Sequence, residues 1–449
     1  MKYDLAILGG GPAGYTAGER AGENGLKAVL FEKKTVGGVC LNEGCIPTKT
    51  LLYSAKILET MRKASRYGIR SEGKPEAVLP QIIERKNRIV QRLVGGVKMK
   101  LSAAGVTVVA GEAMLDGEEN GHIRIRCNGE TYQAKYVLLC TGSETVIPPI
   151  EGLDRTEYWT SREALEATEL PESLAVIGGG VIGMEFASFF NALGVRVKVI
   201  EMMPEILGAT DKEIAALLRA DCKKKGIEFY LGTKVTSVDG RTVRGEKDGK
   251  PLSVEADKLL VSIGRRAVWK GLGLESLGIG TNRSGVTVND CMQTSHPRVY
   301  ACGDITGYSL LAHTAYREAA VAVSHLAGED VKMDYRAIPS VVYTDPELAS
   351  VGLTEEELRA TGAPYTVRKI PMTYSGRYVV ENESFNGLCK LLIDPDERVV
   401  GCHLAGTPAS EFIIAAGMAV ARGYTAEAFG SFVFPHPTVS EILYECVHS

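Results

Sequence analysis

The sequence has no run of about 18 consecutive apolar residues, the length that a membrane-spanning helix requires. Its net charge is only −4, so it has no excess of basic residues for binding nucleic acid or an anionic membrane. The N-terminus carries an acid at Asp4 and leads directly into glycines, without the basic and apolar segments of a signal peptide. These absences predict small-molecule or protein partners, no nucleic acid and no membrane. They also predict a cytoplasmic location, or an organelle matrix if a transit peptide has been removed.

The sequence also has few closely spaced cysteines. Of the ten cysteines, only Cys40 and Cys45 form a close pair, and the others stand singly in apolar stretches, where small buried side chains are expected. In a cytosolic chain a close pair is more often catalytic or metal-binding than structural. Zinc is the weaker of these two alternatives, because no second Cys or His pair with ligand spacing accompanies the first.

A chain of 449 residues is too long for one core and predicts several domains. Residues 3–32 and 174–201 share one plan: an apolar strand, a glycine turn, a helix, and a second strand that ends in an acid. This internal repeat predicts two dinucleotide-binding units. Further expected elements are a helix at 78–102, strands at 106–110, 136–140 and 259–263, a proline-containing linker at 147–152, and an α+β region from about 335 onward. The predicted fold class is α/β, with two Rossmann-like domains and a C-terminal α+β domain.

The two glycine turns carry the nucleotide-binding signal. The first reads Gly9-Gly10-Gly11-Pro12-Ala13-Gly14, and its repeat ends at Glu32, which is expected to accept hydrogen bonds from an adenosine ribose. The second reads Gly178-Gly179-Gly180-Val181-Ile182-Gly183 and ends at Glu201. Such a loop lets a pyrophosphate approach the backbone at a helix N-terminus. The carboxylate of Glu201 favours NAD, because it would repel the 2′-phosphate of NADP, and the nearest upstream cation, Lys198, lies inside the strand.

The cysteine pair has a geometry that a regular helix does not allow. Five residues along a helix advance about 7.5 Å, and bridged cysteines need α-carbons closer than about 7 Å. Gly44, just before Cys45, supplies local freedom, and Pro47 suits the first turn of a following helix. A bridge between Cys40 and Cys45 in such a turn is expected to be strained and easily reduced, as a catalytic disulfide should be.

A histidine near the C-terminus is the remaining candidate. His436 lies between two prolines, and Glu441 follows five residues later. A carboxylate at that position is expected to hold and orient the imidazole as a base, although a lone histidine is more often structural. Pro437 is a candidate for a cis peptide bond.

In this order, together with Thr141-Gly142 and Tyr300-Ala301-Cys302-Gly303-Asp304, these motifs resemble the FAD-containing pyridine nucleotide–disulfide oxidoreductases over essentially the whole chain. Within that family the resemblance is closest to the members that oxidise protein-bound dihydrolipoamide with NAD⁺. The resemblance implies an FAD-binding domain in two segments (1–146 and 265–334), an NAD-binding domain (147–264) and a C-terminal dimerisation domain (335–449).

The resemblance also implies roles for individual residues. It places FAD at Gly9, Gly11, Pro12, Ala13, Gly14, Glu32, Lys33, Gly38, Val39, Cys40, Lys49, Gly111, Ala113, Thr141, Gly142, Asp304, Leu311, Ala312 and His313. It places NAD at Gly178, Gly180, Val181, Ile182, Gly183, Glu185, Glu201, Val235 and Gly264. It implies that Cys45 contacts the flavin, that Cys40 exchanges with substrate, and that Glu185 pairs with Lys49 near the nicotinamide.

The implied enzyme is a homodimer in which His436, supported by Glu441, serves the cysteines of the other subunit. A substrate thiolate attacks Cys40, the second substrate thiol releases it, and Cys45 passes electrons through FAD to NAD⁺. No lipoyl-type segment precedes the first loop. The implied partner is therefore a lipoyl-bearing acyltransferase or a glycine-cleavage carrier protein.

The sequence departs from the family pattern in two places: at Val39, where threonine is more usual, and at Tyr316-Arg317, which are expected to lie close to the flavin site. An NADPH-linked, glutathione-reductase-like enzyme is the main alternative, and Glu201 opposes it. Mercuric reductases and large thioredoxin reductases need an extra C-terminal thiol pair or selenothiol, whereas this C-terminus has Cys446 alone. A flavoprotein kept only for redox sensing is opposed by the complete set of Cys40, Cys45, Lys49, His436 and Glu441.

Overall fold

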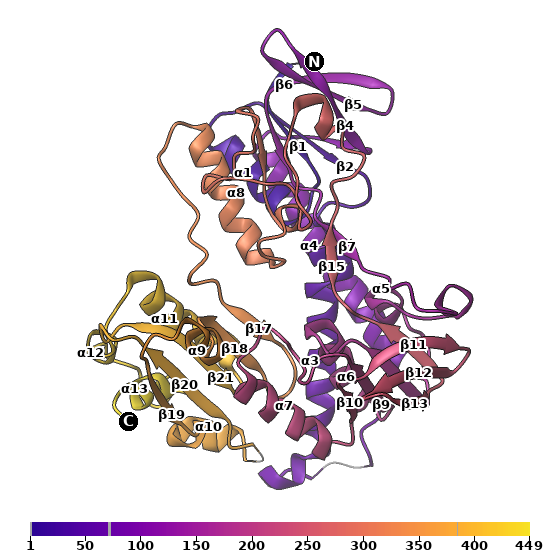
Figure 1. Cartoon of the computed structure of the whole chain (residues 1–449), viewed down its shortest axis with the longest axis vertical. Coiled ribbons are helices and arrows are strands. Elements are labelled where there is room, and N and C mark those ends of the chain that lie inside the picture. Colours follow the sequence, from indigo (N-terminus) through magenta and orange to yellow (C-terminus); the bar gives the residue numbers. More distant parts are fainter. Residues whose placement is uncertain (1, 71–72, 384) are drawn as a thin grey trace. The chain divides into compact units, whose positions relative to one another are not determined.

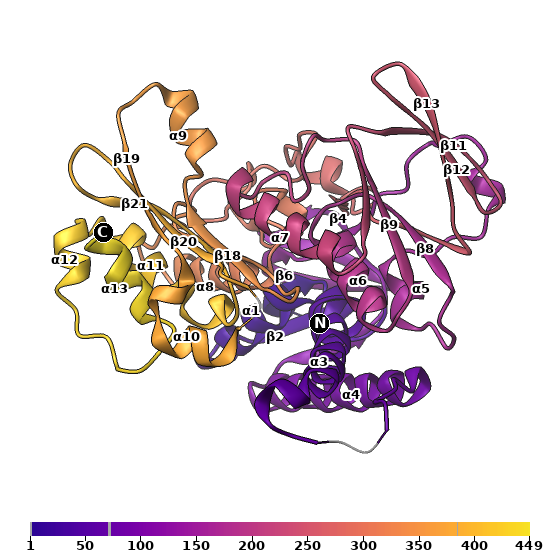
Figure 2. The same ribbon diagram turned by 90° about the horizontal axis from the view of Figure 1, so that it is seen from below.

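The computed structural model describes residues 2–70, 73–383 and 385–449 (Figures 1 and 2). The chain forms two compact units. Unit 1 consists of Met1–Thr50, Gln81–Val146 and Gly264–Asp334, and unit 2 consists of Leu51–Pro80, Ile147–Ile263 and Tyr335–Ser449. The first nucleotide-binding repeat belongs to unit 1, and the second repeat and the C-terminal α+β region belong to unit 2. The four-segment domain scheme stays a prediction.

Unit 1 is built on one large sheet, with strand order β3-β2-β1-β6-β5-β4 and β16 paired to β6. Its elements are β1 (Lys2–Leu8), α1 (Pro12–Glu23), β2 (Ala28–Glu32), α2 (Gly38–Glu43), β3 (Thr107–Ala110), β4 (Ala113–Glu119), β5 (His122–Cys127), β6 (Glu130–Leu139), β7 (Ser143–Thr145), β15 (Arg265–Ala267), β16 (Val299–Ala301) and α8 (Ala312–Leu326). Two more helices, α3 (Cys45–Arg62) and α4 (Leu79–Ala103), each have residues in both units. The parallel strands β1, β2 and β6 are buried over residues 5–8, 28–31 and 137–139, which explains the apolar sequences of those segments. Helices α1 and α8 lie side by side (Figure 1).

The second repeat forms a parallel sheet with order β10-β9-β8-β14 in unit 2. Its elements are α5 (Ser161–Leu165), β8 (Ser173–Ile177), α6 (Val181–Ala192), β9 (Arg196–Glu201), α7 (Lys212–Lys224), β10 (Glu228–Leu231) and β14 (Lys258–Val261). A separate antiparallel sheet contains β11 (Lys234–Asp239), β12 (Thr242–Lys247) and β13 (Lys250–Glu255). Helix α6 packs on β9, as Figure 2 shows. Both expected strand–turn–helix–strand units are therefore confirmed.

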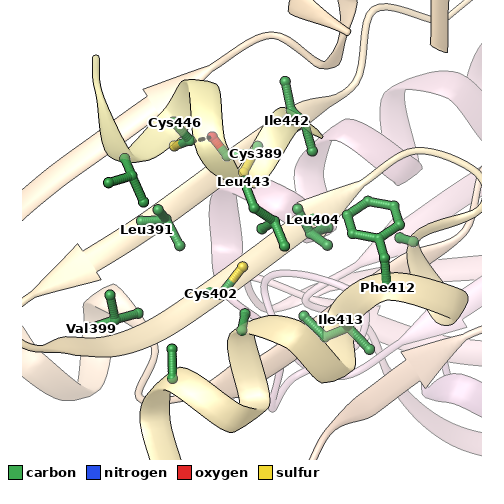
Figure 3. Close-up of a cluster of buried hydrophobic side chains, with 14 of the residues drawn as sticks. Cys389, Leu391, Val399, Cys402, Leu404, Phe412, Ile413, Ile442, Leu443 and Cys446 are labelled. Atoms are coloured by element: carbon green, nitrogen blue, oxygen red, sulfur yellow. Dashed lines mark hydrogen bonds between the residues drawn. The ribbon is translucent and has the colours of Figure 1, made fainter. Parts of the chain in front are cut away.

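The C-terminal part of unit 2 is an antiparallel sheet with order β17-β18-β21-β20-β19. Its elements are β17 (Ser340–Val342), β18 (Leu348–Gly352), α9 (Glu355–Thr361), β19 (Thr366–Ile370), α10 (Gly376–Glu381), β20 (Leu388–Ile393), β21 (Val399–Ala405), α11 (Ala409–Arg422), α12 (Ala426–Gly430) and α13 (Glu441–Val447). Side chains from β20, β21, α11 and α13 share one apolar core, which includes Cys389, Cys402 and Cys446 (Figure 3). All eight cysteines outside the close pair are buried, as the sequence predicted.

A buried ion cluster joins α7 to the C-terminal sheet within unit 2. Lys390 on β20 is 1% exposed, and its Nζ lies 2.9 Å from Asp211 Oδ2 and 2.6 Å from Glu355 Oε2. Asp211 is also the N-cap of α7, where its Oδ1 accepts the Glu213 N–H. Removing one member would leave a buried charge unpaired, so this cluster fixes the C-terminal sheet against the second repeat. Across the described ranges, no helix has both the length and the apolar character needed to cross a membrane.

Candidate active site

The first glycine loop has a backbone that only glycine permits at two positions. Gly9 has a φ of +104°, and a Cβ there would lie 2.2 Å from the carbonyl oxygen of Cys140. A Cβ at Gly14 would lie 1.9 Å from the oxygen of Gly9. Within the described residues, no side chain caps α1 at Gly11. The first N–H groups of α1 therefore remain available to an anionic group, which fits the pyrophosphate of FAD.

Glu32 lies directly against this loop. Its Oε2 accepts the N–H of Gly10 at 2.8 Å, and its Oε1 accepts the N–H of Lys34 at 2.7 Å. The N–H of Gly111 donates to the carbonyl oxygen of Glu32 at 3.0 Å, so the residue that follows β3 contacts the end of β2. In the structure, then, Glu32 holds the glycine loop itself, in addition to the ribose contact expected for it.

The second glycine loop repeats this construction. Gly178 has a φ of +105°, and a Cβ there would lie 2.5 Å from the oxygen of Ser262. A Cβ at Gly183 would lie 2.0 Å from the oxygen of Gly178. The N–H of Gly179 donates to Glu201 Oε2 at 2.6 Å. A glycine turn that leads into a helix without a side-chain cap is thus present again, and this loop fits the pyrophosphate of a second dinucleotide.

Two neighbours of the second loop bear on which nucleotide it takes. Lys198 Nζ donates to the carbonyl oxygen of Glu255 at 3.0 Å, so the nearest upstream cation is held by the backbone. Around Gly180, a Cβ would have no heavy atom within 4 Å among the described residues. The second loop is therefore open at its third glycine, with the Glu201 carboxylate beside it.

The cysteine pair spans the junction of two helices. Helix α2 ends at Glu43, Gly44 adopts φ −146° and ψ −108°, and α3 begins at Cys45. Val39 packs on this junction, because a Cβ at Gly44 would lie 3.3 Å from Val39 Cγ1. The departure at Val39 thus lies beside the helix junction at Gly44. The break predicted from their spacing is confirmed.

The two sulfurs interact with each other and with nearby charges. A hydrogen bond with Cys45, followed by burial, raises the pKa of the Cys40 thiol, whereas the positive charge of Lys49 opposes that rise. The carboxyl of Asp304 adds to the increase in the pKa of Cys40. The surroundings of Cys40 in the reduced pair therefore disfavour a negative charge on its sulfur.

Asp304 is held by a network that joins three separate strands and turns. Burial raises the pKa of Asp304, and a hydrogen bond donated by Ser143 Oγ opposes that rise. Arg265 Nε in turn donates to Ser143 Oγ at 2.8 Å. A Cβ at Gly303 would lie 3.4–3.5 Å from the Cβ atoms of Ala315 and Ala13, so Asp304 follows a point where α1 and α8 converge.

The histidine and acid near the C-terminus form a preassembled pair. His436 Nδ1 lies 2.9 Å from Glu441 Oε1, and the N–H of Thr438 donates to Glu441 Oε2 at 2.8 Å. The Thr438 N–H lowers the pKa of Glu441, burial opposes that shift, and the hydrogen bond and charge of His436 lower the pKa further. The His436 side chain is 80% exposed, and its Nε2 has no partner among the described residues. The His436–Pro437 bond is cis.

Two expected pairings join residues that belong to different units. Glu185 is 3% exposed in unit 2, where its Oε1 accepts the N–H of Tyr343 at 3.1 Å. Lys49 belongs to unit 1, so its pairing with Glu185 stays a prediction. His436 likewise belongs to unit 2 and the cysteines to unit 1. The other expected nucleotide positions lie at or beside the ends of strands and helices: Lys33, Ala113, Thr141, Gly142, Leu311, Ala312 and His313 in unit 1, Val181, Ile182 and Val235 in unit 2, and Gly264 at the unit boundary.

Sequence reasoning missed three residues near these sites. Ser143 and Arg265 hold Asp304, and Tyr15 donates to or accepts from Tyr316, a residue that was noted only as a departure. Neither Ser143 nor Arg265 belongs to a motif, and their separation in the sequence gives no signal that they meet.

Two family models divide the chain between them. The model for pyridine nucleotide–disulphide oxidoreductases matches residues 3–319, and the model for the dimerisation domain of the same family matches residues 338–447. This chain belongs to the pyridine nucleotide–disulphide oxidoreductases. It is thus an FAD- and NAD-using dithiol–disulfide oxidoreductase, as its sequence indicated.

Curated relatives and solved structures agree on the family. The chain is 38% identical to a dihydrolipoyl dehydrogenase of Bacillus subtilis, over 99% of this chain and 97% of the relative. It is 39% identical to that of Thermus scotoductus, over 100% and 97%. Among solved structures, LpdA of Mycobacterium tuberculosis matches with a TM-score of 0.91 at 27% identity, over 99% of both chains. The HOCl-induced flavoprotein disulfide reductase RclA of Escherichia coli matches with a TM-score of 0.85 at 28% identity, over 99% of this chain and 99% of that one.

Proposed function

We propose that this enzyme oxidises dihydrolipoamide with NAD⁺, using Cys40 and Cys45 as its redox pair. The observation that carries the proposal is the contact between these two sulfurs at a helix junction, Gly44, immediately beside a nucleotide-binding loop. Full-length relatives named dihydrolipoyl dehydrogenase support the choice of substrate.

The proposed reaction moves two electrons through two thiol exchanges. A substrate thiolate attacks Cys40 Sγ, the Cys40–Cys45 bond breaks, and Cys45 takes the electron pair as a thiolate. The second substrate sulfur then attacks the first, a ring disulfide closes, and Cys40 is released as the leaving group. Bound FAD supplies the electron transfer from the reduced pair to NAD⁺.

His436 is the proposed base for the substrate thiols. Glu441 holds Nδ1 and leaves Nε2 directed outward, so the exposed nitrogen can accept a proton. We assign this imidazole to the cysteines of a second copy in a homodimer. Exposed apolar side chains support that assembly: Ile414 and Met418 on α11 are 56% and 59% exposed, and Val433 is 96% exposed three residues before His436.

NAD is the proposed electron acceptor because of Glu201. Its carboxylate is fixed by the N–H groups of Gly179 and Met203, beside the open third glycine of the loop. A 2′-phosphate at that corner would meet a fixed negative charge. This feature supports NAD over the NADPH of a glutathione-reductase-like enzyme.

Steady-state turnover tests the proposal. We expect rapid NADH formation from dihydrolipoamide and NAD⁺, and little oxidation of NADPH by glutathione disulfide. The Cys45→Ser and His436→Gln variants should lose at least about a hundredfold in activity, whereas Cys446→Ser, in the apolar core, should retain it. Preference for glutathione disulfide and NADPH, or for another disulfide as in an RclA-like reductase, would overturn the substrate assignment.

The physiological carrier is a separate part of the proposal. The same assay with a lipoylated acyltransferase domain and with a lipoylated glycine-cleavage carrier protein should give a lower KM than free dihydrolipoamide. Equal KM values for free and protein-bound substrate would remove the proposed protein partners. Location in the cytoplasm stays a prediction.

A further inference from the structure

The turn that carries His436 is closed by the hydroxyl of Thr438. Thr438 Oγ1 donates to the carbonyl oxygen of Pro435 at 2.8 Å, and it lies 2.9 Å from Ser440 Oγ. The Thr438 hydroxyl has a single proton, which the bond to Pro435 uses, so Ser440 is the donor in the second contact. Thr438 therefore ties together the residues on both sides of the imidazole.

The backbone of Thr438 also holds the acid of the pair. Its N–H donates to Glu441 Oε2 at 2.8 Å, while Glu441 Oε1 lies 2.9 Å from His436 Nδ1. A carboxylate with both oxygens engaged in this way keeps one orientation. The Thr438 N–H is also the first cause of the lowered pKa of Glu441, so it favours the charged form that the imidazole needs.

A side chain remote in the sequence holds Thr438 in turn. Ser375 lies immediately before α10, 63 residues from Thr438. Its Oγ donates to the carbonyl oxygen of Thr438 at 3.0 Å and accepts the N–H of Tyr378 at 3.2 Å. Ser375 is only 2% exposed, so its loss would leave these partners without ready access to water.

Ser375 is itself fixed by buried neighbours. Its N–H donates to the carbonyl oxygen of Met372 at 3.0 Å, and both Met372 and Tyr378 are 0% exposed. Residues 372–374 contact α13, the helix that begins at Glu441. The hydroxyl of Ser375 thus belongs to the packed C-terminal core, and it reaches from there to the turn of the exposed histidine.

We propose that Ser375 is a positioning residue for the His436 base, although it does not touch the imidazole. Three hydrogen bonds of 2.8–3.0 Å lead from one to the other: Ser375 to Thr438, Thr438 to Glu441, and Glu441 to His436. The inference rests on the role proposed above for His436 as the base for substrate thiols.

The base needs this support because its own side chain is poorly restrained. The His436 side chain is 80% exposed, so packing does little to fix its direction. A base must lie within hydrogen-bond reach of the proton that it accepts, and small misplacements of a reacting group are costly. Without the Ser375 hydroxyl, the Thr438 peptide loses its link to the core, and the acid and imidazole lose their shared alignment.

The test is anaerobic stopped-flow reduction of the flavin by a dithiol, in FAD-loaded enzyme without NAD⁺. Dihydrolipoamide and dithiothreitol serve as parallel probes. We expect Ser375→Ala to lower the limiting rate about tenfold and to leave the dithiol concentration for half-maximal rate unchanged. Ser375→Thr keeps a hydroxyl and should stay within about twofold of wild type.

A double-mutant cycle shows whether Ser375 acts through the imidazole. In the His436→Gln background, Ser375→Ala should cause no further loss, because the group that it positions is already gone. A general disturbance of the fold would instead slow both backgrounds by the same factor. Equal losses in the two backgrounds would overturn the inference.

Thr354→Ala is the matched control for the loss of a helix cap. Thr354 Oγ1 accepts the N–H of Glu357 at 3.2 Å at the start of α9, as Ser375 accepts that of Tyr378 at the start of α10. Both alanine variants should lower the urea midpoint of unfolding. Only Ser375→Ala should slow flavin reduction, and an equal slowing in Thr354→Ala would contradict the positioning role.

The two proposals fail separately in these measurements. Flavin reduction by dithiothreitol but not by dihydrolipoamide would remove the substrate assignment, and the cycle with dithiothreitol would still decide the role of Ser375. A slow His436→Gln enzyme with equal Ser375→Ala losses in both backgrounds would remove the positioning role alone. A His436→Gln enzyme as fast as wild type would remove the base and the role of Ser375 together.

Discussion

Gly9–Gly14 in unit 1 and Gly178–Gly183 in unit 2 turn from strand to helix along nearly the same path. The first glycine has φ of +104° in one and +105° in the other. In each, an acid at the end of the next strand, Glu32 or Glu201, accepts the N–H of the second glycine. The repeat in the sequence is thus a repeat in backbone geometry.

The loops differ in what adjoins the third glycine. At Gly11 the backbone of Gly38 closes in from the cysteine helix, whereas Gly180 has no neighbour within 4 Å of its Cβ position among the described residues. One loop is joined to the redox cysteines and the other is open. The same strand–turn–helix unit therefore suits a cofactor that stays bound in the first case and one that exchanges in the second.

The largest expected effect comes from adding a methyl group to the last glycine of each loop. Gly14→Ala places a Cβ 1.9 Å from Gly9 O, and Gly183→Ala places one 2.0 Å from Gly178 O. We expect Gly14→Ala to lose at least about nine-tenths of its flavin, since such a clash is among the most destabilising changes. Gly183→Ala should remain yellow and lose reduction by NADH. Flavin absorbance per chain measures this, and flavin loss in Gly183→Ala would contradict the division of roles.

The next effect compares the stability of two variants, one beside Gly11, the third glycine of the first loop, and one at Gly180, the third glycine of the second loop. Gly38→Ala puts a Cβ 2.6 Å from Gly11 Cα at a φ of +58°, and should lower the free energy of unfolding by about 2 kcal/mol. Gly180→Ala has room and a φ of −72°, so its change should stay within about 0.5 kcal/mol. Urea unfolding measures the free energy of unfolding of both variants. Equal destabilisation would show that the third glycine is no more crowded in the first loop than in the second.

A smaller effect concerns the acid of the open loop. Glu201→Gln removes a charge beside the nucleotide, and repulsion between charges about 4 Å apart is worth about 1 kcal/mol even in water. We expect the ratio of kcat/KM for NADPH to that for NADH to rise about tenfold. The same change at Glu32 should leave this ratio unaltered. No change in the ratio for Glu201→Gln would remove the electrostatic argument for NAD.

The smallest effect is expected at Lys198. Because its ammonium donates to the carbonyl oxygen of Glu255, Lys198→Ala should change the same coenzyme ratio by less than about twofold. A larger fall in NADPH use would mean that this lysine can reach a 2′-phosphate.

Local signals explain what the sequence could predict. Each glycine turn lies within one strand–helix–strand stretch, and the broken helix between Cys40 and Cys45 follows from their spacing and Gly44. The pairing of His436 with Glu441 is equally local, because Glu441 follows His436 by only five residues in the sequence. These features depend on neighbours in the sequence and were therefore predictable.

Contacts between distant segments escaped prediction. Tyr15 meets Tyr316, Ser143 meets Asp304, and Lys390 is buried with Asp211, yet no periodicity links the members of any pair. A buried lysine also runs against the expectation that charges stay at the surface. Such contacts form only when the fold brings remote strands and helices together. The local sequence around each residue therefore does not predict its partner.

The central claim is that the first loop and the cysteine pair accept electrons from a dithiol without help from the open loop. The most direct test adds dihydrolipoamide to the FAD-loaded enzyme without NAD⁺ under anaerobic conditions, then alkylates the thiols and maps them by mass spectrometry. The account predicts new label on Cys40 and Cys45 and none on Cys389, Cys402 or Cys446. A flavin response with Cys40 and Cys45 unlabelled, or label on the buried core cysteines instead, would contradict it.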